Sequence, residues 1–238
     1  MSPIAQAVQA CRQHIEAALK AYGRAPGETA LLAVSKTFAP ETIREAYAAG
    51  QRAFGENYLQ EALPKIAALA DLPGLEWHFI GPLQSNKTKP VAEHFAWVHA
   101  VDRLKIAERL SAQRPVGLPA LSVCVQVNIS GEASKSGVAP AQALPLALAV
   151  ARLPRLHWRG FMGIAEPCED PARQHAQFAI LRELGAEARR LGLTPDTLSM
   201  GMSADLEAAI AQGSTLVRVG TAIFGHRSVA PPKEGCAA

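Results

Sequence analysis

The sequence predicts an α/β fold, a (β/α)8 barrel of the TIM type with one extra helix at its N-terminal end. Its 238 residues are a typical length for such a barrel. Eight short β-rich segments alternate with longer Ala/Leu-rich segments of helical periodicity, as expected for parallel strands joined by crossover helices. No internal repeat, linker or break in composition divides the chain. An open, doubly wound sheet is the alternative that this alternation also allows.

The first predicted element is an amphipathic helix over residues 4–22, because apolar residues recur there at helical spacing. The eight predicted strands follow at residues 30–35, 52–55, 76–80, 97–100, 122–127, 157–162, 197–200 and 216–219. Helices are expected near residues 40–49, 57–70, 86–94, 103–112, 140–152, 171–191 and 204–212. Residues typical of helix starts are Pro40, Asp102, Pro140 and Ser203. We expect a single barrel domain over residues 1–227 and a disordered tail over residues 228–238.

Composition narrows the possible classes of function. The net charge is +3 without a cluster of Lys or Arg, so nucleic-acid binding is not indicated. The four cysteines form no CxxC pair, which favours reduced thiols over disulfides or a zinc site. The motifs GxxxxGK[ST], GxGxxG and HExxH are absent. Because signal-peptide and membrane-spanning patterns are also missing, we expect a soluble, cytoplasmic protein that holds no metal.

Lys36 ends the first predicted strand, TALLAVSK, at the rim where barrels build their active sites. Apolar neighbours there are expected to lower the pKa of its amine and to free it for Schiff-base chemistry. Taken alone, this position favours a solvent-exposed lysine at the end of a strand over a Schiff-base lysine. The loops after the seventh and eighth strands favour a functional site, because they place Ser203, Gly220 and Thr221 where barrels often bind phosphate.

Arg218 is a charged residue within the otherwise apolar eighth strand. Facing the ring nitrogen of a pyridine cofactor, it would donate a hydrogen bond and keep that nitrogen unprotonated, which disfavours transamination chemistry. A structural arginine paired with a carboxylate fits the sequence equally well.

Seven motifs in fixed order carry a resemblance to a known family. They are AVSKTF (33–38), FGENYLQE (54–61), WHFIGPLQSNK (77–87), VNISGEASKSG (127–137), RGFMGIAEP (159–167), SMGMSAD (199–205) and RVGTAIFG (218–225). With these motifs the chain resembles the pyridoxal phosphate homeostasis protein family from about residue 29 to residue 225. That family is similar to the barrel domain of alanine racemase.

The resemblance implies a fold-type III barrel that holds pyridoxal 5'-phosphate as a Schiff base on Lys36. It implies that the phosphate is held by Ser203, Gly220 and Thr221, and that Arg218 faces the pyridine nitrogen. It also places Asn57 and Met162 near the ring or its phosphate edge. The family is thought to bind, carry and buffer the cofactor, without an established reaction, and apo-enzymes would be its recipients. A monomer is expected, because the racemase's second domain, and with it the usual interface, is missing.

Other polar residues have structural and functional interpretations. Lys135 could act as a second, transient acceptor amine, although such a lysine is more often a solvated loop charge. His78 fits a buried core histidine better than a catalytic one. Residues 84–87 could contact a substrate or cap the next helix. Glu56 and Glu166 are expected to be rim carboxylates without a paired partner at the spacing that acid–base catalysis needs, so neither is assigned an acid–base role.

Two enzymatic alternatives remain. An amino-acid racemase needs a proton donor and acceptor on both faces of the bound substrate, and only Tyr58 is placed near the expected site besides Lys36. Racemase activity is therefore disfavoured, and weak side activity stays open. An aldolase-type barrel with a Schiff-base lysine is the third hypothesis. Aldolases usually carry that lysine on a later strand, so this hypothesis receives little support.

Overall fold

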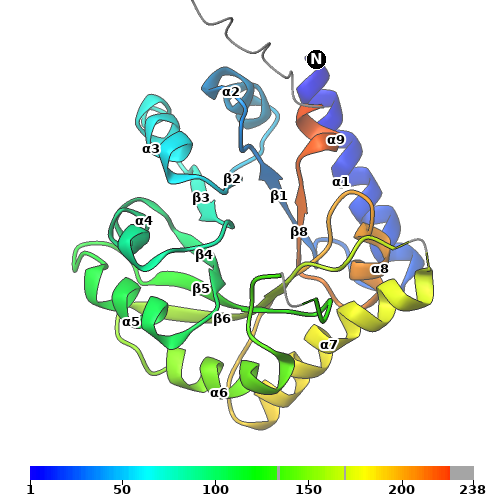
Figure 1. The fold of residues 1–238 in the computed structure, drawn as a ribbon. Coiled ribbons are helices and arrows are strands. Elements are labelled where there is room, and N and C mark those ends of the chain that lie inside the picture. Colours follow the sequence, from blue (N-terminus) through cyan, green and yellow to red (C-terminus); the bar gives the residue numbers. More distant parts are fainter. Residues whose placement is uncertain (133–134, 169, 226–238) are drawn as a thin grey trace, which may run out of the picture.

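The computed structural model describes residues 1–132, 135–168 and 170–225. Its strands are β1 (Ala30–Val34), β2 (Ala53–Glu56), β3 (Glu76–Phe79), β4 (Trp97–Val101), β5 (Leu121–Val127), β6 (Leu156–Gly163), β7 (Thr197–Ser199) and β8 (Leu216–Val219). The strands are parallel and pair in chain order, and β8 closes the barrel by pairing with β1 (Figure 1). The predicted (β/α)8 barrel is confirmed. An open sheet is excluded because these strands form a closed ring.

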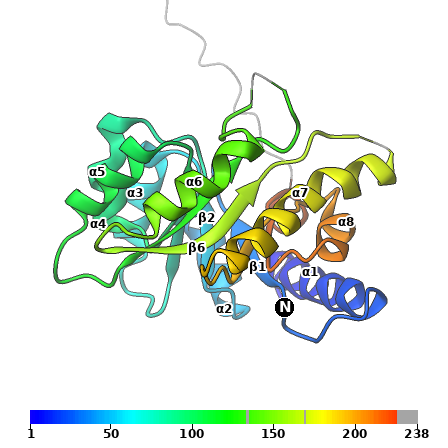
Figure 2. The ribbon, with the colours of Figure 1, turned by 90° about the horizontal axis from the view of Figure 1, so that it is seen from below.

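The helices surround the strands. They are α1 (Pro3–Ala21), α2 (Pro40–Ala48), α3 (Leu59–Ala68), α4 (Thr88–His94), α5 (Leu104–Gln113), α6 (Pro140–Val150), α7 (Pro171–Arg190), α8 (Leu206–Ala211) and α9 (Thr221–Phe224), with the 3-10 helix η1 (Ser85–Lys87) before α4. The extra helix α1 packs alongside α8 and α9 (Figures 1 and 2). It begins after Ser2, whose hydroxyl accepts the N–H of Ala5 at 3.2 Å.

Most element boundaries lie within two residues of the predicted ones. Pro40 and Pro140 are the first residues of α2 and α6, as predicted. Two predicted helix starts are wrong. The carboxylate of Asp102 pairs with Arg103 at 2.7 Å, and α5 begins at Leu104 without a side-chain cap. Ser203 lies in the turn before α8, which begins only after Asp205.

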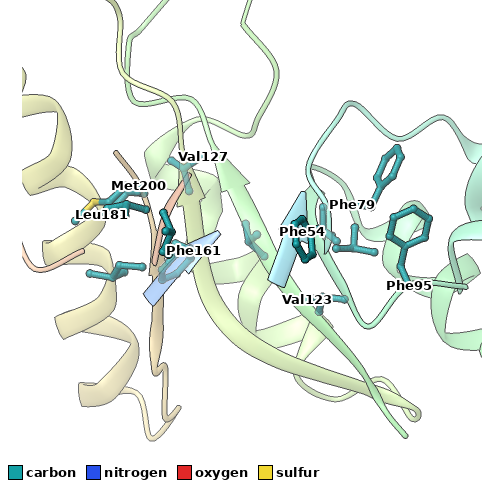
Figure 3. Packing of buried hydrophobic residues seen from close by; sticks show 14 of the residues in the cluster. Phe54, Phe79, Phe95, Val123, Val127, Phe161, Leu181 and Met200 are labelled. Atoms are coloured by element: carbon teal, nitrogen blue, oxygen red, sulfur yellow. The ribbon is translucent and has the colours of Figure 1, made fainter. Parts of the chain in front are cut away.

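The hydrophobic core fills the space between the strands and the helices. Figure 3 shows Phe161 and Met200 grouped with Leu181 of α7, while the rings of Phe79 and Phe95 meet edge to face at 5.4 Å. Alternate strand residues point outward, so their aliphatic and aromatic side chains pack against the surrounding helices.

The interior of the barrel has a different character. Val217 and Val219 of β8 belong to the outer core, so Arg218 between them points inward. Trp97, Cys124 and Met162 form a small separate cluster. Buried polar side chains lie beside this cluster, and they are His78, His99, Ser199 and Arg218. Burying polar groups costs free energy unless they are hydrogen-bonded. This polar interior therefore indicates a functional site in the barrel.

The predicted tail over residues 228–238 lies outside the described residues. Within them, Cys11, Cys124 and Cys168 are free thiols. No described helix combines the length and the apolar character that crossing a bilayer requires. In the same part of the chain, no group of three or more His, Cys, Asp or Glu residues could hold a metal ion.

Candidate functional site

Lys36 and Gly220 lie at the same rim because β1 and β8 are neighbours in the barrel. Lys36 follows the end of β1 by two residues, and Gly220 directly follows β8. A cavity of about 360 Å³ lies over this rim and is lined by Val34, Lys36, Thr37, Phe38, Gly220, Thr221 and Gly225. Volumes above roughly 300 Å³ are typical of small-molecule sites.

A second cavity of about 320 Å³ adjoins the first through Val34, Lys36, Gly220 and Thr221, which line both. The structure brings six of the seven predicted site residues to this second cavity, namely Lys36, Asn57, Ser203, Arg218, Gly220 and Thr221. Met162, the seventh, is not among its lining residues. It is buried in the cluster with Trp97 and Cys124, and it packs against Ile164, which does line the cavity.

The backbone around Lys36 is held by two residues of α3. Lys65 donates to the carbonyl of Ser35 at 2.8 Å, and Glu61 accepts the backbone N–H of Thr37 at 2.9 Å. Thr37 has a φ of 69°, in the left-handed region that β-branched residues rarely adopt. The bonds from α3 therefore hold the end of β1 in a conformation that the isolated chain would avoid.

Glu56, expected as a carboxylate at the rim, is a buried residue with an ion-pair partner that the sequence did not indicate. It is fully buried, it accepts from the hydroxyl of Ser35 at 2.7 Å, and it forms an ion pair with Lys65 at 2.9 Å. Burial raises the pKa of Glu56, and the hydrogen bonds from Lys65 and Ser35 oppose this shift. The prediction failed because Lys65 comes from a helix nine residues later and returns over the strand end.

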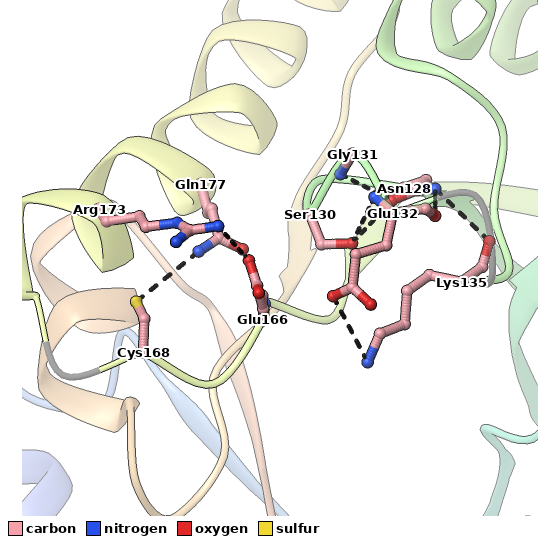
Figure 4. A network of polar contacts seen from close by, with 9 residues as sticks. All are labelled: Asn128, Ser130, Gly131, Glu132, Lys135, Glu166, Cys168, Arg173 and Gln177. Atoms are coloured by element: carbon pink, nitrogen blue, oxygen red, sulfur yellow. Dashed lines mark hydrogen bonds and ion pairs between the residues drawn. The ribbon is translucent and has the colours of Figure 1, made fainter.

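Glu166 is held by two residues of α7. Its carboxylate pairs with Arg173 of α7, and its backbone N–H donates to Gln177 at 2.7 Å (Figure 4). These contacts tie the loop after β6 to α7. No acid–base role was predicted for Glu166, and its ion pair gives it a structural one.

The loop after β7 brings Ser203 to the cavity. Gly201 starts this loop at a φ of 96°, and a Cβ atom there would lie 2.6 Å from the Cβ of Ala209. Asp205 then closes the turn by accepting the backbone N–H of Met202 at 2.5 Å. Neither the hydroxyl nor the backbone N–H of Ser203 or Thr221 bonds another described residue. These groups are donors available to an anion.

Arg218 lines the second cavity and is itself buried. One nitrogen, Nη1, donates to the carbonyl and the hydroxyl of Ser199 at 2.6 and 2.7 Å, and Nη2 donates to the carbonyl of Gly163 at 2.8 Å. Burial lowers the pKa of Arg218 to about 10, which leaves the guanidinium charged at neutral pH. Among the described residues, its hydrogen-bond acceptors are two carbonyls and one hydroxyl. Nε takes part in none of these three bonds.

Asn57 reaches the cavity from the end of β2. A Cβ atom on Gly81 would lie 2.3 Å from the backbone oxygen of Asn57, so only glycine permits this approach of the two loops. The side-chain oxygen of Asn57 is buried without a hydrogen-bond partner. Because a buried unpaired amide costs free energy, this group is suited to a bound polar ligand.

The other polar residues that the sequence singled out lie elsewhere. His78 is a buried core histidine, as predicted. Tyr58 is half exposed and lines a different cavity, together with Gln84 and Lys87 of the predicted polar loop. Lys135 lies in the loop after β5, where its amine is 4.0 Å from the carboxylate of Glu132 (Figure 4). This position fits the solvated loop charge.

Four residues around the site were not predicted: Glu61, Lys65, His99 and Ser199. The last two carry a signal in the sequence, because each is a polar residue within a buried strand. His99 follows Trp97 by two residues and therefore shares its face of β4. No comparable local pattern marks Glu61 or Lys65, which look like ordinary charges on a helix.

The groups at this rim have complementary chemistry. An amine can bond an aldehyde carbon, hydroxyl and N–H donors can hold an anionic tail, and a buried guanidinium can donate to an aromatic nitrogen. The residues present therefore fit a small, anionic, aromatic aldehyde.

Comparisons with known proteins find similar sequences and folds. The alanine racemase N-terminal domain family matches residues 8–228. A Pseudomonas aeruginosa protein named pyridoxal phosphate homeostasis protein is 62% identical over 232 residues, 98% of this chain and 99% of that protein. The structure of PipY from Synechococcus elongatus with PLP bound is 40% identical and has a TM-score of 0.77, covering 89% of this chain and 100% of PipY. Alanine racemase from Corynebacterium glutamicum, at 19% identity, shares the fold with a TM-score of 0.72 over 96% of this chain and 62% of the racemase.

Proposed function

The chain belongs to the pyridoxal phosphate homeostasis proteins, within the alanine racemase N-terminal domain family, and we propose that it binds pyridoxal 5'-phosphate and acts in intracellular homeostasis of that cofactor. One observation carries the proposal. The amine of Lys36, the guanidinium of Arg218 and the open donors of Ser203 and Thr221 line one cavity. The names of the relatives and the PLP in the PipY structure support the same ligand.

Each residue has a proposed role in holding the cofactor. Lys36 supplies the amine, which condenses with the aldehyde carbon to form a C=N bond and releases water. Ser203, Gly220 and Thr221 hold the phosphate, and Arg218 donates to the pyridine nitrogen without giving up its own proton. Asn57 contributes its unpaired amide. Met162 supports the site from the layer below.

We also propose that this protein carries the cofactor and is not an enzyme. Racemisation of an amino acid needs a proton donor or acceptor on each face of the bound substrate. Tyr58, the only tyrosine expected near the site, lines a cavity without Lys36, and no finding favours the racemase alternative. The single domain over residues 1–227, the monomeric state, the cytoplasmic location and delivery to apo-enzymes belong to this proposal as well.

Absorbance spectroscopy tests the covalent attachment. Protein mixed with pyridoxal 5'-phosphate should develop a band at about 420 nm, the region of a protonated C=N bond to this cofactor. Reduction with borohydride followed by peptide mass spectrometry should place the added mass on Lys36. Lys36→Ala should remove the band, whereas Lys105→Ala, a change at an exposed lysine of α5, should keep it. Protein that takes up no cofactor would refute the proposal.

Two further assays separate a carrier from an enzyme. A panel of amino acids should show no racemisation above a Lys36→Ala background. Transfer of the cofactor from loaded protein to an apo-enzyme should restore that enzyme's activity. Turnover of any amino acid that depends on Lys36 would favour the racemase instead.

A further inference from the structure

A line of hydrogen bonds crosses the interior of the barrel below the cavity that contains Lys36. Nη1 of Arg218 donates to the hydroxyl of Ser199 at 2.7 Å, and that hydroxyl lies 2.8 Å from Nδ1 of His99. Nε2 of His99 lies 2.9 Å from Nδ1 of His78, and Nε2 of His78 lies 3.3 Å from the carboxylate of Glu76. We call Arg218, Ser199, His99, His78 and Glu76 the interior chain.

Strand positions explain why these side chains meet. Glu76 and His78 are two residues apart on β3, so they share the inward face of that strand. His99 lies on the neighbouring strand β4, and Ser199 and Arg218 lie on β7 and β8 across the barrel. All except Glu76 are buried, and the ring of His78 stacks on Trp97 with 5.1 Å between centroids and 8° between planes.

The chemistry of arginine sets the direction of these hydrogen bonds. A guanidinium has donors and no acceptor, so the oxygen of Ser199 must accept, and its single hydrogen is available to His99. Nδ1 of His99 is then the acceptor, and its Nε2 carries the hydrogen that His78 accepts at Nδ1. The hydrogen on Nε2 of His78 finally faces Glu76. Each group from Arg218 to His99 therefore donates to the next, and the remaining hydrogen on His78 points towards Glu76 without a hydrogen bond.

The opposite order is unfavourable at both ends. His99 would then donate to the oxygen of Ser199, and the hydroxyl hydrogen of Ser199 would have no acceptor among the described residues. It would also turn a lone pair of His78 towards the carboxylate of Glu76. The 3.3 Å contact with Glu76 is an ion-pair distance without hydrogen-bond alignment, so the chain ends on an electrostatic contact.

Burial, more than the neighbouring charges, disfavours the protonated form of both imidazoles. Burial lowers the pKa of His99 well below its usual value, and the neighbouring His78 and Arg218 lower it further. Burial also lowers the pKa of His78, which Glu76 opposes and Arg159 reinforces. Two neutral imidazoles are what a one-way order requires, because a protonated imidazole has two donors and no acceptor.

We propose that His99 and His78 are positioning residues for Arg218, because they fix the hydrogen of Ser199 and thereby hold the guanidinium in one orientation below the cavity. Nη1 bonds the carbonyl and the hydroxyl of Ser199, and Nη2 bonds the carbonyl of Gly163. Among the described residues, no acceptor bonds Nε or the second Nη2 hydrogen of Arg218, so both can donate to a ligand. The expected effect of the two histidines on cofactor affinity rests on the proposed function. The order of hydrogens along the interior chain is a property of the ligand-free protein and can be tested without the cofactor.

Nitrogen-15 NMR of the ligand-free protein tests the order directly. His78 and His99 should each show a neutral ring with the hydrogen on Nε2, and resonances assigned by His78→Gln and His99→Gln should identify them among the seven histidines. Ser199→Ala removes the donor to Nδ1 of His99 and should give a mixture of its tautomers. A hydrogen on Nδ1 of either ring in the unaltered protein would overturn the proposal, whatever the cofactor does.

Cofactor titration tests the positioning role. His99→Gln keeps one donor and one acceptor and should leave the Kd for pyridoxal 5'-phosphate within about twofold, whereas His99→Leu should raise it about tenfold, as for one lost buried hydrogen bond. His157→Leu, an exposed histidine at the start of β6, is the matched control. Equal Kd values for His99→Leu and the control would overturn the positioning role. If His99→Leu does not fold, Ser199→Ala serves in its place, with the same expected weakening. Absence of binding in the unaltered protein would refute the proposed function and leave the NMR result standing.

Discussion

Thr37 donates its backbone N–H to the carboxylate of Glu61 at 2.9 Å, and this bond holds a β-branched residue at a φ of 69° directly after Lys36. The contact joins the end of β1 to the first turn of α3. It stabilises a conformation in which Lys36 faces the cavity, although threonine disfavours that backbone geometry.

Removing the carboxylate of Glu61 should expose this strain. We expect Glu61→Ala to lower the free energy of unfolding by about 1 kcal/mol, the usual net value of one hydrogen bond. Adding Thr37→Gly should recover much of this loss, because glycine adopts positive φ at little cost. Urea denaturation of the single and double variants measures both effects. A double variant as unstable as Glu61→Ala alone would show that the strain at Thr37 is negligible.

The buried ion pair between Glu56 and Lys65 predicts a larger effect. Lys65→Met leaves a carboxylate buried without its cation, which should cost about 3 kcal/mol of unfolding free energy. The additional change Glu56→Gln should recover part of that cost, because it removes the uncompensated charge. Lys89→Met, at an exposed lysine of α4, is the control and should change the stability little. The urea midpoints of the four proteins test this order, and a Lys65→Met variant as stable as the control would contradict it.

Gly201 and Gly213 form a matched pair for testing the loop after β7. Both have positive φ, but a Cβ atom would strike Ala209 at position 201 and would meet nothing within 4 Å at position 213. Gly213→Ala should therefore cost about 1 kcal/mol from backbone strain alone. Gly201→Ala should cost more and should also weaken pyridoxal 5'-phosphate binding, because the loop carries Ser203. Thermal unfolding and cofactor titration measure the two effects. Equal losses at the two sites would contradict the role of this close contact.

The two interior histidines predict a loss of stability at mildly acidic pH. Their pKa values are lowered in the folded protein, so below the unfolded value of about 6.5 the unfolded chain binds more protons. Stability is therefore highest above that pH and falls as the pH drops from about 6.5 towards the folded pKa values. His99→Gln should make this fall shallower. The difference between the two proteins isolates His99 from Glu56 and Asp205, whose raised pKa values act in the opposite direction. Parallel pH profiles would contradict the prediction.

Much of the site was accessible from sequence because parallel strands place their carboxyl ends at one rim. Lys36, Ser203, Gly220 and Thr221 each follow a strand, so counting strands was enough to bring them together. Asn57 was added by the family resemblance. Met162 was added in the same way, and it lies in the cluster with Trp97 and Cys124 and is not among the residues that line the cavity.

The roles of the charged and polar supports were not accessible in this way. Glu56 looked like a rim carboxylate, and only the return of α3 over β2 gives it Lys65 as a buried partner. Arg218 was undecided between a ligand and a carboxylate, and its partners Ser199 and Gly163 come from two other strands. Such pairings join residues far apart in sequence, so local periodicity does not predict them.

By itself, the sequence determined the barrel, its order of strands and helices, and the lysine and the two glycine-containing loops at its rim, because alternation of apolar residues and strand ends are local properties. Tertiary structure alone decided how Arg218 is held, which carboxylates are paired and which histidines meet inside the barrel. Closing the ring brings β3, β4, β7 and β8 around one interior, and only there do the hydrogen-bonding needs of their buried side chains select one arrangement.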